Sequence, residues 1–153
     1  MEMIASFEIS IESRRRHLDA NMRLAGFKLI GQGRHRRTYL SPNKKYVLKF
    51  PMCSDALAVN RHEQEIWRAY KNTSQDDGTL YAPCRLIKDF VLMMWAVDSS
   101  YGCSFGDERA FSKDMLVRLD ETDAPSWVFD IDATQAGYLP DGRLVAYDYG
   151  YAY

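Results

Sequence analysis

The closing part of the sequence constrains the fold most, because it places carboxylates at both ends of a predicted hairpin. Asp130 and Asp132 precede the turn Leu139-Pro140-Asp141-Gly142, and Asp148 follows a short apolar run. In that turn proline presets φ and glycine accepts a positive φ. A hairpin brings its two ends together, so these carboxylates are suited to holding Mg²⁺ or taking a proton from a hydroxyl. Taken alone, the pattern favours ordinary solvated turn residues, since Asp is common at strand ends.

The composition indicates one packed domain without a membrane span. The chain has 153 residues, 46% of them hydrophobic and 13% aromatic, which is enough for a core of ordinary size. Its longest apolar run, Phe90–Val97, is too short to cross a bilayer, and the N-terminus lacks the pattern of a signal peptide. Cys53, Cys84 and Cys103 show no metal-ligand spacing, so we expect reduced packing residues. A cytoplasmic location is therefore expected.

Charge is unevenly distributed, although the net charge is −1. Residues 1–50 hold 11 Lys and Arg against 4 Asp and Glu (+7), and residues 51–153 hold 9 against 17 (−8). A basic half is suited to nucleic acid, nucleotide phosphates or an acidic partner, and it is equally able to pair with the acidic half inside the molecule. Arginines gather in two clusters, Arg14–Arg16 and Arg34–Arg37.

Periodicity and turn residues predict an α+β fold. Three short extended segments joined by turns form an antiparallel meander, and a helix with a broad apolar stripe follows. Two more strands, a second helix and the closing hairpin come next. Within residues 1–25, Phe7, Ile9 and Ile11 alternate as in a short strand, and residues 13–24 are able to form a polar helix. The expected segments are the strands Phe27–Gly31, Arg37–Leu40, Tyr46–Phe50, Cys84–Lys88 and Phe90–Ala96, and the helices Asp55–Lys71, with Ser54 as N-cap, and Asp107–Asp120.

Gly31 and Gly33 lie in a turn between the first two strands. Glycine lets backbone amides approach phosphate oxygens closely, and the basic residues 34–37 attract the same anion. The alternative is an ordinary hairpin with a solvated basic tip, which two glycines alone do not exclude.

Lys49 lies at the end of the third strand between apolar neighbours. A lysine on such a segment needs a counter-charge or must extend its ammonium group to solvent. Glu63, in the middle of the following helix, is the expected partner, and Glu65 is the alternative. The order of the features is more informative than each one alone: glycine turn, strand lysine, helix glutamate, apolar strand and paired carboxylates.

In that order the chain resembles the eukaryotic-type protein kinase superfamily over about residues 27–150. Val47-Leu48-Lys49 looks like the VAIK segment of the family. Gly31 and Gly33 match two glycines of its GxGxxG loop, and Arg36 replaces the third. The resemblance implies a kinase-like N-lobe around Lys49.

The C-terminal spacing is the most specific part of this resemblance. In the family, the catalytic-loop Asp is followed five residues later by Asn and some thirteen beyond that by the Asp of DFG. Here Gln135 follows Asp130 by five residues and precedes Asp148 by thirteen, and Asp148-Tyr149-Gly150 reads as DYG. Asp130 and Asp148 therefore look like the catalytic-loop Asp and the DFG Asp of the family.

The resemblance implies an ATP site. Lys49 would pair with the α- and β-phosphates, and Glu63 would hold Lys49 in place. Met93 would lie near the gatekeeper position, and the backbone of residues 94–97 would face an adenine ring. The implied nucleotide-binding residues are Gly31, Gly33, Lys49, Glu63, Met94 and Asp148.

The resemblance also implies Mg²⁺ beside the nucleotide. Asp148 and Gln135 would bind the metal, while Asp130, with Lys49, would act on the acceptor hydroxyl and the phosphate. Gln135 replaces the family's Asn, and its longer side chain moves the ligand oxygen, which Mg²⁺ tolerates badly. Asp132 replaces a lysine that contacts the transferred phosphate, and Val128-Phe129 replaces a His-Arg pair.

A division of the chain follows from the same resemblance. Residues 1–25 would be an N-terminal extension, residues 27–98 the N-lobe and hinge, and residues 99–153 a strongly reduced C-lobe carrying the catalytic loop and the DYG hairpin. Together they would form one minimal kinase-like domain. The sequence ends three residues after Gly150, so we expect the protein to lack the activation loop and the substrate-binding helices of a complete kinase.

Three functions remain as hypotheses. The favoured one is a pseudokinase-like module that binds ATP and Mg²⁺ and regulates or inhibits a macromolecular partner, as a phage or mobile-element product would do to a host protein. The alternative is an active phosphotransferase that moves the ATP γ-phosphate to a protein or small-molecule hydroxyl. The third is a nucleic-acid or nucleoprotein binder using Arg14–Arg16 and Arg34–Arg37. The expected lack of a substrate lobe favours a non-catalytic role.

Overall fold

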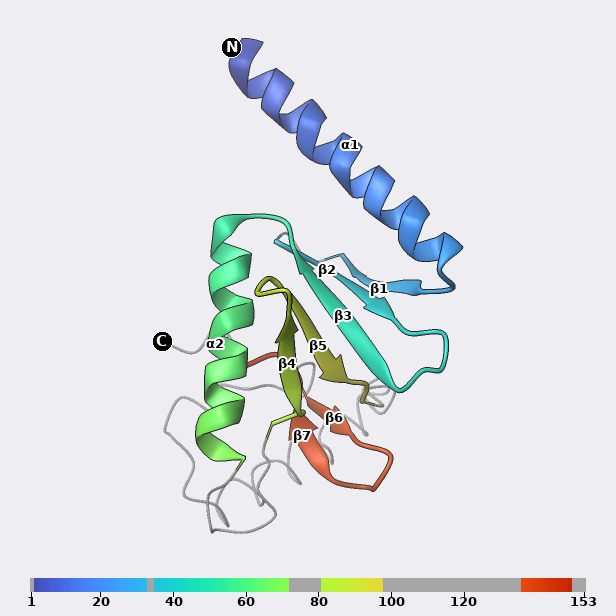
Figure 1. Ribbon diagram of the computed structural model, residues 1–153, viewed down its shortest axis with the longest axis vertical. Helices are drawn as coiled ribbons and strands as arrows, with labels where there is room; N and C mark the ends of the chain where they lie inside the picture. The colour runs from blue at the N-terminus through green and yellow to red at the C-terminus, as the bar shows by residue number, and fades with distance from the viewer. Residues whose placement is uncertain (1, 33–34, 72–80, 98–135, 150–153) are drawn as a thin grey trace, which may run out of the picture.

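The computed structural model describes residues 2–32, 35–71, 81–97 and 136–149 (Figure 1). Five strands form one antiparallel sheet in the order β1-β2-β3-β5-β4, and two short strands form a separate hairpin. The elements are α1 (Glu2–Leu24), β1 (Lys28–Gln32), β2 (Arg36–Leu40), β3 (Tyr46–Pro51), α2 (Ser54–Tyr70), β4 (Cys84–Ile87), β5 (Val91–Trp95), β6 (Ala136–Tyr138) and β7 (Leu144–Ala146). This arrangement confirms the predicted α+β class, with an antiparallel sheet and one long helix beside it.

The N-terminal extension is helical from Glu2 to Leu24, so the short strand expected around Phe7, Ile9 and Ile11 is wrong and the polar helix expected over residues 13–24 is confirmed. α1 projects beyond the sheet (Figure 1) and ends in a Schellman motif. Gly26 takes a φ of 84°, the amide of Phe27 donates to the Met22 carbonyl and the amide of Gly26 to the Arg23 carbonyl, both at 2.9 Å. Gly26 therefore ends α1, as a glycine just past the C-terminus of a helix commonly does.

Asp19 fixes the C-terminal half of α1 to the sheet. Its carboxylate accepts hydrogen bonds from both Nε and Nη2 of Arg37, the first at 2.9 Å, and from the hydroxyl of Tyr39. Burial and the bond to Asp19 raise the pKa of Tyr39 to about 12. One arginine of the Arg34–Arg37 cluster is therefore used inside the molecule.

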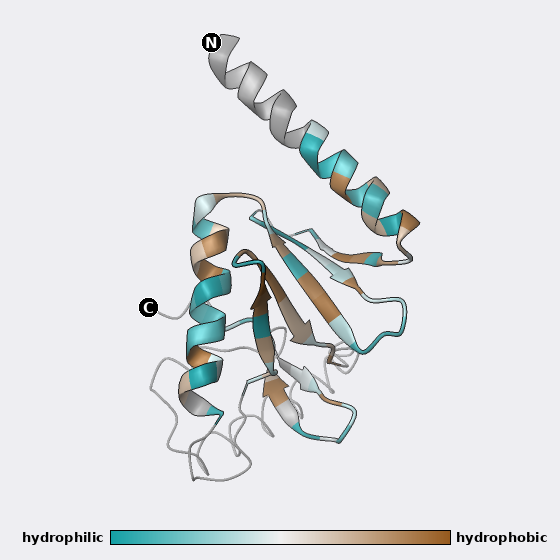
Figure 2. Ribbon diagram, in the orientation of Figure 1, coloured by the Kyte–Doolittle hydropathy of each residue, from teal (hydrophilic) through white to brown (hydrophobic). Residues whose placement is uncertain are grey.

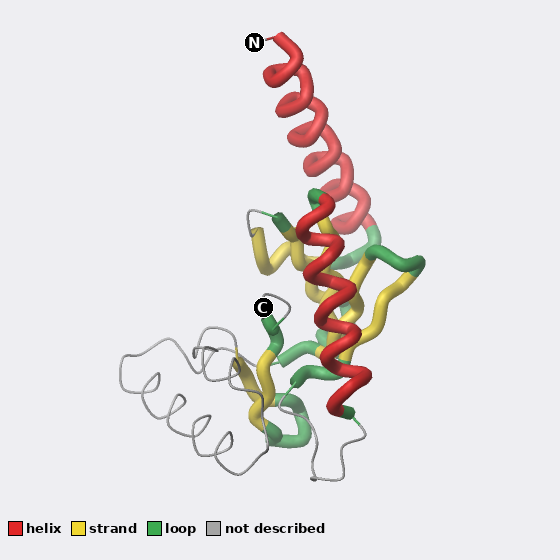
Figure 3. Tube along the Cα trace, turned by 90° about the vertical axis from the view of Figure 1, so that its left-hand side faces the viewer, coloured by secondary structure: helices red, strands yellow, loops and turns green. Residues whose placement is uncertain are grey.

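The main sheet buries one face against α2. Val47 and Lys49 of β3 pair with Met94 and Leu92 of β5, so all four side chains point to the same face, and all four are buried. α2 packs along β3, β4 and β5 on this side, as the turned view shows (Figure 3). The core thus continues from β3 through β5 to the edge strand β4.

α2 begins one residue earlier than predicted. Cys53, not Ser54, is the N-cap residue; its backbone is extended and its side chain makes no capping hydrogen bond. Cys53 is exposed, with its Sγ 3.4 Å from Nδ1 of His35, so the expectation of a buried packing residue is wrong there. Cys84 is buried as expected, and Cys103 lies outside the described residues.

The closing hairpin has the predicted turn. Gly142 takes a φ of 86°, and its amide donates to the Leu139 carbonyl at 2.9 Å. The amide of Ala82 donates to the carbonyl of Ala146 at 2.7 Å, which attaches the end of the hairpin to the segment that leads into β4. The predicted helix Asp107–Asp120 and the predicted catalytic loop lie outside the described residues. Within the described part of the chain, no helix is both long and apolar enough to cross a membrane.

Candidate functional site

Four charged side chains from distant parts of the chain meet on the buried face of the sheet. Lys49 Nζ lies 3.2 Å from Glu63 Oε2, which confirms the predicted pair. Arg36 contacts both carboxylates of the cluster, with Nη1 3.1 Å from Glu63 Oε1 and Nη2 2.6 Å from Asp148 Oδ1. We call Arg36, Lys49, Glu63 and Asp148 the charge cluster.

Strand alternation and helix packing place these residues. Lys49 lies opposite Leu92 of β5 and shares its inward orientation. The side chains of Arg36, Lys49 and Glu63 are 8%, 5% and 0% exposed, whereas that of Asp148 is 32% exposed. Lys49 also donates to the backbone carbonyl of Tyr147. Of these four described side chains, those of β2, β3 and α2 are therefore buried, and that of Asp148 is the most open to solvent.

The most buried face of α2 is partly polar, in contrast to the apolar stripe expected from the sequence. Its buried residues are Ala56, Asn60, Glu63 and Ile66, whereas Leu57 and Trp67 are only half buried. The middle of this helix is hydrophilic (Figure 2). A carboxylate can occupy that face because two cations bind it there.

Asn60 links the charge cluster to the backbone. Its Nδ2 donates to the carbonyls of Lys49 and Phe90, both at 3.0 Å, and its Oδ1 accepts from Nη1 of Arg36 at 3.1 Å. Sequence reasoning missed this residue. The available signal was its position three residues before Glu63, which puts both side chains on one face of a helix.

Burial and pairing act in opposite directions on the ionisation of the cluster. Burial lowers the pKa of Lys49, and the attraction of Glu63 opposes that shift only in part. Burial would raise the pKa of Glu63, but attraction to Lys49 and Arg36 outweighs it, so the pKa of Glu63 is lowered. Glu63 is therefore ionised at neutral pH in spite of its complete burial.

Stability should fall in acid. The pKa values of Glu63 and Asp19 are lowered from ordinary values of 4.5 and 3.8. A carboxyl with a lowered pKa in the folded state contributes stability that is complete above its unfolded pKa and is lost as pH falls through the folded pKa. We expect the free energy of unfolding, measured in urea at a series of pH values, to decrease below about pH 4.5. Constant stability from pH 7 to pH 3 would contradict this ion-pair assignment.

Tyr149, the central residue of DYG, fixes the chain beside Asp148. Its side chain is buried, its hydroxyl donates to the Ala82 carbonyl at 2.8 Å, and it lies 3.2 Å from the Sγ of Cys84. Its ring centroid is 4.8 Å from that of Tyr81. Burial raises the pKa of Cys84 to about 12, which keeps this sulfur as a thiol. The anchored tyrosine therefore determines where the Asp148 carboxylate lies.

The described residues do not fit a divalent cation at Asp148. One oxygen of this carboxylate already accepts a charge-assisted bond from Arg36. In the described part of the chain no three His, Cys, Asp or Glu side chains are grouped closely enough to hold a metal. Gln135, the second predicted ligand, lies outside the described residues, as do Asp130 and Gly33, and their roles stay predictions.

Gly31 lies within β1, where the sequence had suggested a phosphate-binding turn. It is paired with Thr38 of β2, and a Cβ added at Gly31 would stand 3.3 Å from the Thr38 Cβ. Close approach of the two strands is therefore one reason for a glycine here. Its contact with a phosphate stays a prediction.

The predicted hinge needs one correction, at its backbone amides. Met93 points away from Lys49, because its neighbours Leu92 and Met94 occupy the buried face, and its place near the gatekeeper position stays a prediction. The amides of Trp95 and Ala96 donate to the carbonyls of Pro83 and Lys45, each at 3.0 Å, and these two amides are not available to an adenine ring. Met94 is fully buried on the Lys49 side of the sheet.

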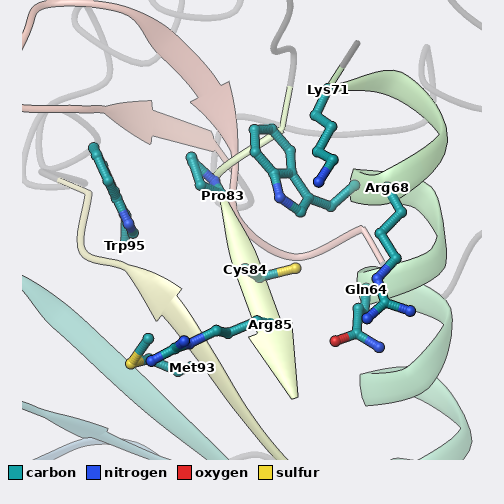
Figure 4. Close-up of a pocket in the computed structure, with 9 residues that line it drawn as sticks. Gln64, Arg68, Lys71, Pro83, Cys84, Arg85, Met93 and Trp95 are labelled. Carbon is teal, nitrogen blue, oxygen red and sulfur yellow. The ribbon is translucent and has the colours of Figure 1, made fainter. Parts of the chain in front are cut away.

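A separate pocket of about 440 Å³ lies between α2 and the β4–β5 edge of the sheet (Figure 4). None of its lining residues belongs to the charge cluster. Arg68 of α2 and Lys71, the C-cap residue of this helix, line it on one side, and Arg85, Met93 and Trp95 of the strands line it on the other. This pocket is therefore separate from the charge cluster.

Comparison with known proteins gives only distant similarities. No protein-family model matches the sequence, and no curated protein matches it. Two similar solved structures are a streptomycin–ATP ternary complex of APH(2″)-IIa, at 16% identity and a TM-score of 0.44, and the ADP-bound aminoglycoside phosphotransferase APH(2″)-Ib, at 17% and 0.48. The similarities cover 74% and 78% of this chain but 40% and 42% of those chains, so this chain spans about two fifths of their length. With TM-scores this low, these similarities carry no argument about the function of this chain.

Proposed function

We propose that this protein is a kinase-like module that binds a nucleotide through its phosphates. The observation that carries the proposal is the buried Lys49–Glu63 pair, at 3.2 Å, between a strand and the helix beside it. In protein kinases a strand lysine held by a helix glutamate contacts the nucleotide phosphates. Desolvation also makes a buried lysine a strong electrostatic partner for an anion, because little water screens it.

We further propose that the module acts by binding and regulating or inhibiting a macromolecular partner. The charge cluster is balanced, with two cations and two carboxylates, and each charge has a partner within it. Such a network of paired charges is suited to holding a folded scaffold together. This choice of a non-catalytic role is tested by the transfer assay below.

Nucleotide binding is tested by a thermal-shift titration. We expect ATP at about 100 times its dissociation constant to add about 2.7 kcal/mol to the free energy of unfolding, which corresponds to roughly 5–10 °C in Tm. Adenosine, which lacks phosphates, should have a much smaller effect at the same concentration. No change in Tm with either ATP or ADP would contradict the proposed nucleotide binding.

A second candidate is phosphotransfer from ATP to a hydroxyl of a protein or small molecule. The Lys49–Glu63 pair favours it, because active kinases need this pair in place. Incubation with γ-labelled ATP and generic protein and small-molecule acceptors tests it. Label that reaches an acceptor in the wild type, and is lost in Asp130→Ala, would replace the non-catalytic proposal with this one.

We do not propose that this protein binds nucleic acid. Arg36 and Arg37 of the second arginine cluster are held in internal ion pairs, with Glu63 and Asp148 and with Asp19. Of the first cluster, Arg14 and Arg16 are exposed on α1. A few surface arginines without an aromatic platform are an unspecific signal.

A further inference from the structure

Arg36 is the residue of the charge cluster that the sequence reasoning did not explain. It is the first residue of β2, it stands where the kinase glycine loop has its third glycine, and its side chain is only 8% exposed. A guanidinium is planar and carries five N–H donors, so it is able to bind several oxygen atoms at once. In this protein it binds oxygens of Asn60, Glu63 and Asp148.

The Arg36–Asp148 contact carries the inference. The distance from Nη2 to Oδ1 is 2.6 Å, and the contact joins residues 112 positions apart in the sequence. The predicted metal-binding carboxylate is therefore already neutralised by a cation of the protein itself. A divalent cation at Asp148 would lie next to a guanidinium, and it would add two positive charges to a cluster that is already balanced.

We propose that Arg36 takes the place of the divalent cation, so that the site binds the polyphosphate of a nucleotide without a metal. This inference rests on the proposed nucleotide binding. Arg36 and Lys49 are the two cations that contact the phosphates, and Asp148 orients Arg36. A guanidinium binds phosphate oxygens through parallel charge-assisted N–H bonds, so it is able to make without a metal the contacts that Mg²⁺ would otherwise make.

The test is isothermal titration calorimetry with ATP, in excess EDTA and in excess MgCl₂. We expect the wild type to bind ATP at least as tightly in EDTA as in MgCl₂. Arg36→Gln should weaken binding in EDTA about tenfold or more, because it removes a charge-assisted contact. In MgCl₂ this variant should regain part of the affinity, since its Asp148 carboxylate is released for the metal. Arg85→Gln, which changes an exposed arginine of β4, is the matched control and should behave as the wild type.

The outcomes separate this inference from the proposed function. Wild-type binding that appears only with MgCl₂ would overturn the role of Arg36 and leave nucleotide binding intact. Equal affinity of wild type and Arg36→Gln in EDTA would overturn it as well. No binding heat in either buffer would overturn the proposed function and, with it, this inference. If Arg36→Gln does not fold, the ATP affinities of the wild type in EDTA and in MgCl₂ are sufficient to test the role of Arg36.

Discussion

Replacing Glu63 with alanine should lower the free energy of unfolding by about 3–5 kcal/mol, the cost typical of removing one partner from a buried ion pair. Glu63 is completely buried and is the shared counter-charge of Lys49 and Arg36. Without it, the carboxylate left beside the two buried cations among the described residues would be that of the partly exposed Asp148. Lys49 would also lose the contact that orients it, so ATP binding should weaken together with stability.

Glu65 offers a matched control for this experiment. It lies two residues further along α2 and is exposed, so Glu65→Ala should change stability by no more than about 0.5 kcal/mol. Urea denaturation of both variants at neutral pH measures the difference. A loss below about 1 kcal/mol in Glu63→Ala would mean that the buried pair contributes little to this fold.

The second large effect is expected at Tyr149. Truncation to alanine should cost about 3–5 kcal/mol, because it leaves a cavity beside Tyr81 and Cys84 and removes the hydrogen bond to the Ala82 carbonyl. The same change should loosen the segment that carries Asp148 and thereby weaken its contact with Arg36. Urea denaturation gives the stability, and calorimetry with ATP in EDTA gives the effect on the site.

Tyr149→Phe separates the ring from the hydroxyl. It keeps the packing against Tyr81 and loses the bond of the hydroxyl to the Ala82 carbonyl and its contact with the Cys84 Sγ, so a cost of roughly 1–2 kcal/mol is expected. If Tyr149→Phe were as destabilising as Tyr149→Ala, the hydroxyl bond, and not ring packing, would be the main anchor of this segment.

Local patterns in the sequence were sufficient for much of the fold. Alternation and turn residues placed each strand of the main sheet within one or two residues, and proline and glycine predicted the turn before β7. The partnership of Lys49 with Glu63 was also predictable, because a lysine between apolar strand residues requires a buried counter-charge.

Long-range contacts were not predictable from such patterns. From the sequence, Arg36 is expected at the solvated tip of a basic hairpin. It contacts Glu63 and Asp148 only once the chain has folded. In the sequence, Asn60 is one polar helix residue among several. Its role follows from the folded structure, in which it binds the backbone carbonyls of Lys49 and Phe90. The N-terminal helix was predictable only in part, because Phe7, Ile9 and Ile11 alternate as in a strand although this part of the chain is helical.

The measurement that tests nucleotide binding at the charge cluster most directly is a titration of a fluorescent ATP analogue into wild type, Lys49→Met and Lys45→Met. Lys49→Met should fold, because Arg36 still binds Glu63 at 3.1 Å, and Lys45 is an exposed matched control. We predict saturable binding to wild type and Lys45→Met, and no measurable binding to Lys49→Met over the same range. Equal affinity of wild type and folded Lys49→Met would contradict the assignment of this site.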